Sequence, residues 1–293
     1  MPRLRALALV VSLAAANAYA ADEAQLKRGE YLFNAGGCTS CHTDRKADVP
    51  SLAGGRGLKT PFGTFYGPNI TPHPTAGIGK WSDADFMRAM HDGRGPDGTH
   101  FFPVFPYTSF TEMTDRDVKD LKAYVFSLPP VDRPSKPHEV SFPFNIRFLQ
   151  IGWRMFNFTP GRFQPDPKAG AEVNRGAYLA RAVVHCGECH TPRNFMGGLK
   201  TSMWLAGTVN GPEGETAPNI TPDPDTGIGK WSVKDIANYL QDGVDPDGGF
   251  AGSLMAEVIK NATGKLTDAD RAAIAAYLKQ IPPIANKLRR SQH

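Results

Sequence analysis

Two short stretches with the same pattern decide the fold of this chain: CTSCH at residues 38–42 and CGECH at residues 186–190. In each stretch, two cysteines stand three positions apart and a histidine follows directly. Thiols at i and i+3 lie on one face of a helical turn, where both can add to the vinyl groups of one haem, and the adjacent imidazole then ligates the iron. The pattern predicts two covalent haem c groups, held by Cys38, Cys41, Cys186 and Cys189, with His42 and His190 as proximal ligands.

Two other chemistries use paired cysteines. A thioredoxin-like redox dithiol needs a strand before its cysteines, and no strand pattern precedes either pair. A zinc site built from all four cysteines leaves both histidines unexplained. Because the full five-residue pattern occurs twice, the sequence favours haem over both alternatives.

The N-terminus has the pattern of a secretory signal peptide. Arg3 and Arg5 precede an apolar run over residues 6–16, and the tripeptide AYA at residues 18–20 fits a small-x-small cleavage site. We therefore expect residues 1–20 to be a signal peptide, cleaved after Ala20, and the mature chain to lie in the periplasm. The alternative is an uncleaved N-terminal anchor, for which the apolar run is short.

The charge and hydropathy of the chain exclude several partners. The formal net charge is +4, and removal of the two arginines of the signal peptide leaves +2. A charge this small gives no argument for nucleic acid or an anionic membrane as a partner. No later stretch reaches the roughly 18 apolar residues of a membrane span, so we expect none in the mature chain.

The chain repeats itself with a shift of 150 residues over its central block. The sequence PNITP at residues 68–72 returns at 218–222, and GIGKWS at residues 77–82 returns at 227–232. Self-similarity at a fixed spacing indicates repeated structural units. The sequence therefore predicts two homologous domains, each with one cysteine motif.

We place these domains at residues 25–131 and 170–285, with an aromatic, Pro-rich linker over residues 132–169. Each domain is expected to be all-α, with three main helices joined by long Gly/Pro loops. In the first domain the helices are predicted over about residues 25–34, from the cap residue Ser82 onward, and from Thr114 to just before Pro129.

The order of these motifs resembles class I cytochrome c. The chain is most similar to the cytochrome c subunits of periplasmic alcohol, aldehyde and sugar dehydrogenases, which carry PNITPD, G-I-G-x-W and Met-Ala-Glu-Val-Val-like segments. Here these stand at residues 218–223, 227–231 and 255–259, and residues 142–153 resemble the family's linker. The resemblance implies an all-α fold of two tandem class I domains, each with a few helices and long loops around a covalent haem. Family members often have three haems, whereas this chain has two motifs.

The resemblance also places the sixth iron ligand in the loop before the last helix of each domain. In the second domain this ligand is Met255, with core packing as the alternative role. The shift of 150 residues makes Phe105 its counterpart, and phenylalanine cannot ligate iron. The first haem therefore needs another ligand or has an open iron.

Three residues are candidates for that ligand. Met113 lies in the right loop, but it aligns with Leu266 and so has a packing role at a helix start as its rival. His91 aligns with Gln241, and His100 lies in the loop itself. The sequence leaves Met113, His91 and His100 open.

Two further groups of aromatic residues have a predicted place. Trp81 and Trp231 occupy matched positions of the repeat and are expected to form one wall of each haem pocket, with core packing as the alternative. The aromatic segment of residues 142–158 is expected to pack in the cleft between the domains. Its alternative role is a docking face for a partner.

These observations predict an electron-transfer protein or oxidoreductase subunit rather than an enzyme in its own right. Electrons are expected to come from a periplasmic dehydrogenase and to leave to a downstream cytochrome or terminal oxidase. The alternative is a dihaem enzyme of the peroxidase or thiosulfate dehydrogenase type, with an open or weakly ligated first haem. The missing methionine at position 105 is the feature that favours it.

Overall fold

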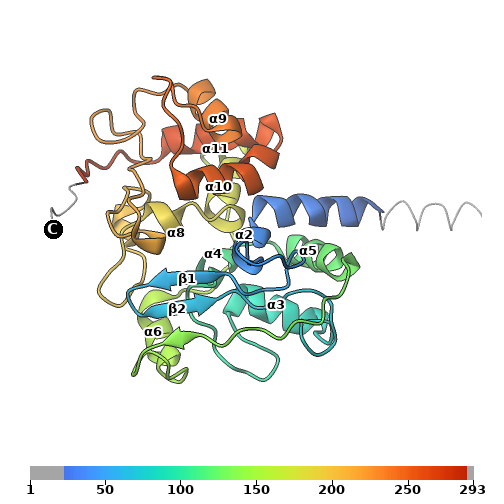
Figure 1. Ribbon diagram of the computed structural model, residues 1–293. Coiled ribbons are helices and arrows are strands. Elements are labelled where there is room, and N and C mark those ends of the chain that lie inside the picture. Colours follow the sequence, from blue (N-terminus) through green and yellow to red (C-terminus); the bar gives the residue numbers. More distant parts are fainter. Residues whose placement is uncertain (1–22, 289–293) are drawn as a thin grey trace, which may run out of the picture.

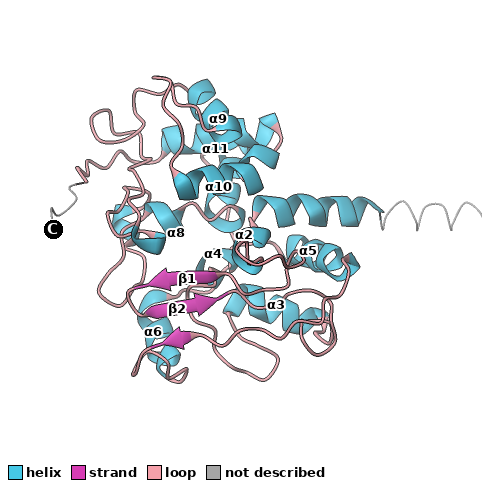
Figure 2. Cartoon of the chain, in the orientation of Figure 1, coloured by secondary structure: helices cyan, strands magenta, loops and turns pink. Residues whose placement is uncertain are grey.

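The computed structural model describes residues 23–288, so the predicted signal peptide lies outside the described part of the chain. The fold consists of two helical units joined by the linker, with one small sheet beside the first unit (Figure 1 and Figure 2). The first unit has a helix over residues 23–35, α2 (Cys38–His42), β1 (Gly57–Thr60), β2 (Gly63–Tyr66), α3 (Asp83–Asp92), α4 (Tyr107–Phe110) and α5 (Asp115–Ser127).

The linker contributes β3 (Glu139–Val140) and α6 (Leu149–Asn157). The helices of the second unit are α7 (Ala171–Tyr178), the π-helical turn η1 (Leu179–Val183), α8 (Gly187–His190), α9 (Val233–Asp242), α10 (Ser253–Asn261) and α11 (Asp268–Gln280). Short 3-10 turns lie between them: η2 (Thr201–Met203), η3 (Pro212–Gly214) and η4 (Thr263–Lys265).

The helix starts follow from side-chain caps repeated in both units. At α3, the Ser82 hydroxyl accepts a hydrogen bond from the backbone N–H of Asp85, whose carboxylate accepts one from the N–H of Ser82. Ser232 makes the same reciprocal pair at α9, and Thr114 and Thr267 cap α5 and α11. Such caps satisfy backbone donors that have no partner inside the helix. The predicted helix starts at Ser82 and Thr114 are confirmed.

The sheet is an addition to the expected helices. β1 pairs antiparallel with β2, with Gly57 opposite Tyr66, and β3 extends the sheet with Glu139 opposite Thr64. The strands have four, four and two residues. Runs this short give too little alternation of apolar and polar residues to be recognised in a sequence. Through β3, the linker folds back against the first unit.

A glycine at the same place in both repeats allows the first and last helices of each unit to touch. A Cβ at Gly29 would lie 2.1 Å from the carbonyl oxygen of Asp120 in α5. A Cβ at Gly176 would lie 1.8 Å from the carbonyl oxygen of Ala273 in α11. Only glycine permits so close a backbone approach. This contact explains why glycine recurs in the repeated segment before each cysteine motif.

The two units share one hydrophobic core and exchange a hydrogen bond across their interface. The buried cluster contains Leu32 and Leu121 of the first unit together with Leu179 and Ile274 of the second. Figure 1 shows the helix of residues 23–35 lying between α5 and the helices of the second unit.

The exchange follows the repeat. The Tyr31 hydroxyl donates to the Asp270 carboxylate of α11 at 2.6 Å, and the Tyr178 hydroxyl donates to the Asp117 carboxylate of α5. Each tyrosine oxygen also accepts the backbone N–H of the helix cap beside it, Thr267 or Thr114. Each unit therefore completes the start of its partner's last helix, which joins the units by approximate two-fold symmetry.

The expectation that the aromatic linker packs in the cleft is wrong for most of its side chains. Trp153 is buried and donates its indole N–H to the carbonyl oxygen of Met196 at 2.8 Å. In contrast, Phe142, Phe148 and Phe156 are 78%, 74% and 78% exposed. The linker covers the first unit with its polar side and leaves its large apolar side chains in solvent.

We predict that Tyr31→Phe and Tyr178→Phe each lower the free energy of unfolding of the holoprotein by about 2 kcal/mol, because each removes a hydrogen bond to a carboxylate. Urea unfolding measures the loss. Tyr124→Phe is the matched control, because its hydroxyl contacts Glu30 of the same unit at 3.5 Å. Equal stability of all three variants would contradict the account of the interface.

Candidate haem sites

Each cysteine motif forms a single helical turn. Cys38 and Cys41 lie in α2, and Cys186 is the N-cap of α8, which contains Cys189. No disulfide joins Cys38, Cys41, Cys186 or Cys189 to one another. The spacing of i and i+3 therefore places both thiols of a motif on one side of a turn, as attachment to one haem requires.

The four thiols are set in environments that keep them neutral. Burial raises the pKa of Cys38, Cys186 and Cys189 to about 12 and that of Cys41 to about 11. Redox dithiols need a lowered pKa, and zinc needs thiolates. Within residues 23–288, no group of three or more His, Cys, Asp or Glu side chains is placed to hold a metal ion. The raised pKa values argue against a redox dithiol.

The two motif histidines are oriented by the same bond. His42 Nδ1 lies 2.8 Å from the carbonyl oxygen of Pro68, and His190 Nδ1 lies 2.8 Å from that of Pro218. A carbonyl oxygen only accepts, so Nδ1 carries the proton and Nε2 keeps its lone pair for iron. Burial lowers the pKa of both rings, against the opposing effect of this bond, and so favours the neutral imidazole that a metal binds. The residues present fit a haem iron.

The repeated PNIT segment holds these carbonyl groups in place. The Asn69 side chain donates to the carbonyl oxygens of Val131 and Arg133 and accepts from both the backbone and the hydroxyl of Thr71. Asn219 in the second unit accepts in the same way from Thr221 and donates to Ile284. The sequence showed that this segment repeats. Its role, which is to fix the carbonyl that orients the proximal histidine, emerges only from the structure.

Met255 lies in the first turns of α10 and packs, partly buried, against the core. The first unit anchors this helix, because Glu257 pairs with Arg45 at 2.6 Å and with Arg56 at 3.0 Å. The counterpart of Met255, Phe105, packs its ring 5.5 Å from that of Phe110. The position that carries a methionine in one unit thus belongs to an aromatic cluster in the other.

The structure separates the three candidates for the first iron by their surroundings. Met113 is buried directly before the cap of α5, as Leu266 is before that of α11. His91 is buried in α3, and neither of its ring nitrogens has a hydrogen-bond partner. Burial, with a smaller effect of Arg162, lowers the pKa of His91 to about 4. His100 lies in the loop before α4, where its carbonyl oxygen accepts from Arg147.

The two tryptophans take equivalent places in the two units. Trp81 and Trp231 are partly buried against the core, and the backbone N–H of each donates to the isoleucine three residues earlier. The ring of Trp231 also packs against Tyr239, with centroids 5.3 Å apart. Both tryptophans precede the cap of the helix that follows, so they share one position in the repeat.

Each cysteine motif contacts the other unit across the interface, which the sequence did not reveal. Asn261 of α10 donates to Ser40 inside the first motif at 3.0 Å. Thr108 and Ser109 of α4 donate to Glu188 inside the second motif at 2.8 and 3.0 Å. Directly before the two motifs, His185 Nε2 of the second unit lies 3.4 Å from the carbonyl oxygen of Gly36 of the first. The first motif therefore contacts α10, which contains Met255, and the second motif contacts α4, which follows Phe105.

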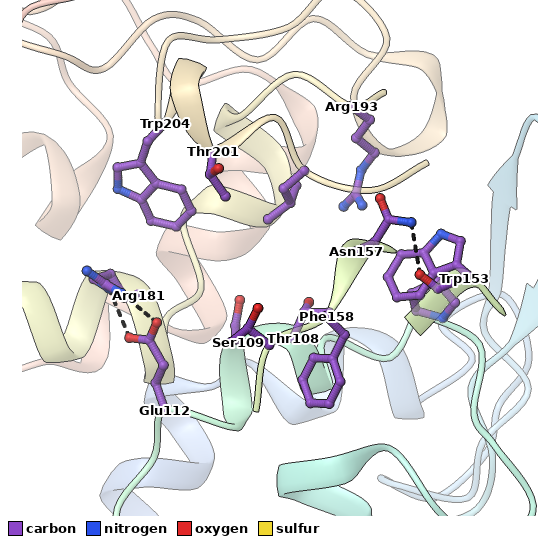
Figure 3. Close-up of a pocket in the computed structure, with 13 residues that line it drawn as sticks. Thr108, Ser109, Glu112, Trp153, Asn157, Phe158, Arg181, Arg193, Thr201 and Trp204 are labelled. Atoms are coloured by element: carbon purple, nitrogen blue, oxygen red, sulfur yellow. Dashed lines mark hydrogen bonds and ion pairs between the residues drawn. The ribbon is translucent and has the colours of Figure 1, made fainter. Parts of the chain in front are cut away.

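A cavity of about 340 Å³ lies beside the second motif, between the units and the linker (Figure 3). Its charged residues are paired, since Arg181 bonds Glu112 at 2.6 Å and Arg193 bonds the buried Glu188 at 2.7 Å. The ring of Trp204 covers Gly187 of the motif, where a Cβ would lie 2.2 Å from it. This cavity lies at the seam where the first unit, the linker and the second unit meet.

A family model described as Cytochrome c matches residues 26–129 and again residues 173–282. The chain belongs to the cytochrome c family. With two such domains, two oriented histidines and two pairs of thiols, this cytochrome binds two covalent haem c groups.

Curated relatives cover most of the chain. It is 47% identical to a "Diheme cytochrome c-type" protein of Cereibacter sphaeroides over 89% of this chain and 87% of that protein. It is 40% identical to a "Fructose dehydrogenase cytochrome subunit" of Gluconobacter japonicus, over 89% of this chain and 54% of that subunit. It is 38% identical to an "Alcohol dehydrogenase (quinone), cytochrome c subunit" of Gluconacetobacter polyoxogenes, over 95% of this chain and 60% of that subunit. The cytochrome thus spans little more than half the length of these subunits.

Among the residues that the structure describes, no helix has the length and apolar character needed to cross a membrane.

We predict that Asn69→Ala raises the reduction potential of the first haem and leaves that of the second unchanged, and that Asn219→Ala does the reverse. Loss of the amide frees the proline carbonyl, so the histidine Nδ1–H is held less well and the ligand becomes less basic. Redox titration of both variants measures this, with each serving as the control for the other. A change in both potentials at once would contradict the assigned role.

Proposed function

We propose that this cytochrome is a periplasmic electron carrier that accepts electrons from a dehydrogenase and passes them to a downstream cytochrome or oxidase. The observation that carries the proposal is the interface at which each unit contacts the cysteine motif of the other, Thr108 with Glu188 and Asn261 with Ser40, which brings two haem-binding units together. The names of relatives as cytochrome subunits of fructose, alcohol and gluconate dehydrogenases support it. The proposal includes export, with removal of residues 1–20.

The chemistry divides between cofactor and chain. When bound, each haem supplies one iron that alternates between the ferric and ferrous states. His42 and His190 ligate these irons through Nε2, because Pro68 and Pro218 hold Nδ1. Electron transfer needs no catalytic side chain. The chain's part is to position the two haems and to limit their contact with water.

Met255 is proposed as the sixth ligand of the second iron, on the first turns of a helix that the Glu257 ion pairs hold against the first unit. A thioether ligand raises the haem potential. Trp81 and Trp231 are proposed as walls of the two haem pockets.

The first iron is proposed to use Met113, with His91 and His100 as rivals. Leu266 shows that the position of Met113 also serves packing. His91 is buried with neither ring nitrogen in a hydrogen bond, and its Nδ1 lies 3.8 Å from the Asp115 carboxylate. The alternative of a dihaem peroxidase or thiosulfate dehydrogenase gains no support, since the relatives' names describe cytochromes and dehydrogenase subunits.

We predict that Met255→His lowers one haem potential and leaves the other nearly fixed, because imidazole replaces a thioether on one iron only. Three further variants place the residue of the second repeat into the first: Met113→Leu, His91→Gln and His100→Phe. Only the variant that removes the true ligand alters the first potential and its spectrum in a redox titration. A Met255→His protein with two unchanged potentials would show that Met255 only packs.

The proposed function predicts reduction of both haems by a dehydrogenase substrate. Tagged full-length cytochrome is isolated from its own cells with its bound partners, and ethanol, D-fructose and gluconate are added in turn. Absorbance of reduced haem should rise with one of them and reach the level given by dithionite. Rapid oxidation of reduced protein by hydrogen peroxide, with no response to any substrate, would instead support the dihaem enzyme.

A further inference from the structure

The helix α6 of the linker turns most of its polar side chains toward the protein and most of its large apolar side chains toward solvent. Its inward face consists of Gln150, Trp153, Arg154 and Asn157, whereas Phe148, Leu149, Ile151, Met155 and Phe156 point to solvent. A surface helix of a soluble protein normally turns its apolar stripe to the core. The helix α6 does the opposite, so its outward face is built to be covered.

The exposed surface extends beyond the helix. It continues through Phe142 and Phe144, whose ring lies 4.9 Å from that of Phe62 in the β1–β2 turn. Gly197 lies beside the Phe62 ring, and its neighbour Phe195 is 93% exposed. We call this surface the linker patch; it comprises Phe142, Phe144, Phe148, Leu149, Ile151, Met155, Phe156 and Phe195.

The linker patch has the area of a stable protein interface. At roughly 200 Å² for each fully exposed ring, its five phenylalanines alone expose about 700 Å². The largest apolar patch of a monomer is roughly 300–600 Å², and a stable interface takes about 800 Å² from each partner. With its three aliphatic or methionine side chains, the linker patch reaches the second value.

The charges near the linker patch argue against a lipid surface. Residues 141–158 contain two charged side chains, both arginines. Arg147 donates to the carbonyl oxygen of His100 at 2.9 Å and Arg154 donates to that of Asp92, so both are held against the first unit. An interfacial membrane helix instead presents its cations beside its apolar face, toward lipid headgroups. The linker patch lacks that arrangement and fits an apolar protein surface.

The inward face of α6 packs against both units. The helix α6 packs on residues 92–107 through Arg154 and through the Trp153 ring, which lies 6.4 Å from the Tyr107 ring. Arg147, just before α6, bonds the same segment. This segment contains Phe105, the counterpart of Met255. Trp153 and Asn157 also bond Met196 and Asn194 of the second unit, so a protein bound to the linker patch is about one helix diameter, roughly 10 Å, from both units.

We propose that the linker patch is the permanent docking surface for the dehydrogenase. The inference rests on the proposed function and adds where the partner binds. Transient electron-transfer partners meet over smaller surfaces, whereas permanent subunit interfaces are larger and more apolar. A permanently bound donor fits the linker patch better than a diffusing acceptor.

The test uses the full-length holoprotein with Phe148→Ser and Phe156→Ser combined, and separately Met155→Lys. The control is Phe250→Ser, since Phe250 is 83% exposed in the loop before α10. The probe is the dehydrogenase that co-purifies with wild type and reduces its haems on addition of substrate. Because the bound dehydrogenase would bury Phe148 and Phe156, replacing both should weaken its binding to the cytochrome about 100-fold or more.

We expect both patch variants to lose the dehydrogenase and substrate-driven haem reduction, while haem content and both potentials stay at wild-type values. The control should behave as wild type. Patch variants that bind the enzyme normally would overturn the inference and leave the proposed function standing, whereas absence of substrate-driven reduction in wild type would end the proposed function itself. If the patch variants lose only binding to phosphatidylethanolamine–phosphatidylglycerol vesicles, the linker patch binds lipid and the inference is overturned. If they lose only a wild-type homodimer seen by light scattering, the linker patch binds a second copy of the chain and the inference is likewise overturned.

Discussion

The hydrogen bond from a histidine Nδ1–H to a proline carbonyl, made once in each unit, is the constraint on which both haem sites depend. It sets the proton on Nδ1 and leaves Nε2 for iron, and burial of the ring favours the neutral form that this requires. Asn69 and Asn219 hold the two carbonyl groups through bonds to chain segments more than 60 residues away. The loops around each site are thus ordered by specific polar contacts rather than by regular secondary structure.

The pairing of the units is a second consequence of the repeat. Two copies of one small domain, each with a polar tyrosine on its first helix and an aspartate on its last, join by exchanging the same hydrogen bond. This arrangement lets each unit contact the cysteine motif of the other, and it lets Arg45 and Arg56 of one unit hold the helix of Met255 in the other. Stability of the interface and alignment of the two centres therefore arise from the same contacts.

The sequence predicted what depends on local pattern: the two attachment motifs, the repeat, and the helix starts at Ser82 and Thr114. It did not predict the three-stranded sheet, because its strands are too short for alternation to appear. It also missed the contacts of Ser40 and Glu188 across the interface, since these join residues whose spacing has no motif. The aromatic linker was misjudged because apolar composition normally indicates burial, whereas here the polar side of α6 faces inward and the apolar side faces solvent.

The central claim is that one chain moves electrons between two haems across its own interface, and a flash-reduction experiment tests it most directly. A short pulse reduces a small fraction of the haems of the oxidised protein, and absorbance at wavelengths that separate the two centres follows their equilibration. The account predicts a phase whose rate does not change when the protein is diluted tenfold. A rate that falls in proportion to protein concentration would show that electrons pass between chains instead, and would contradict the account.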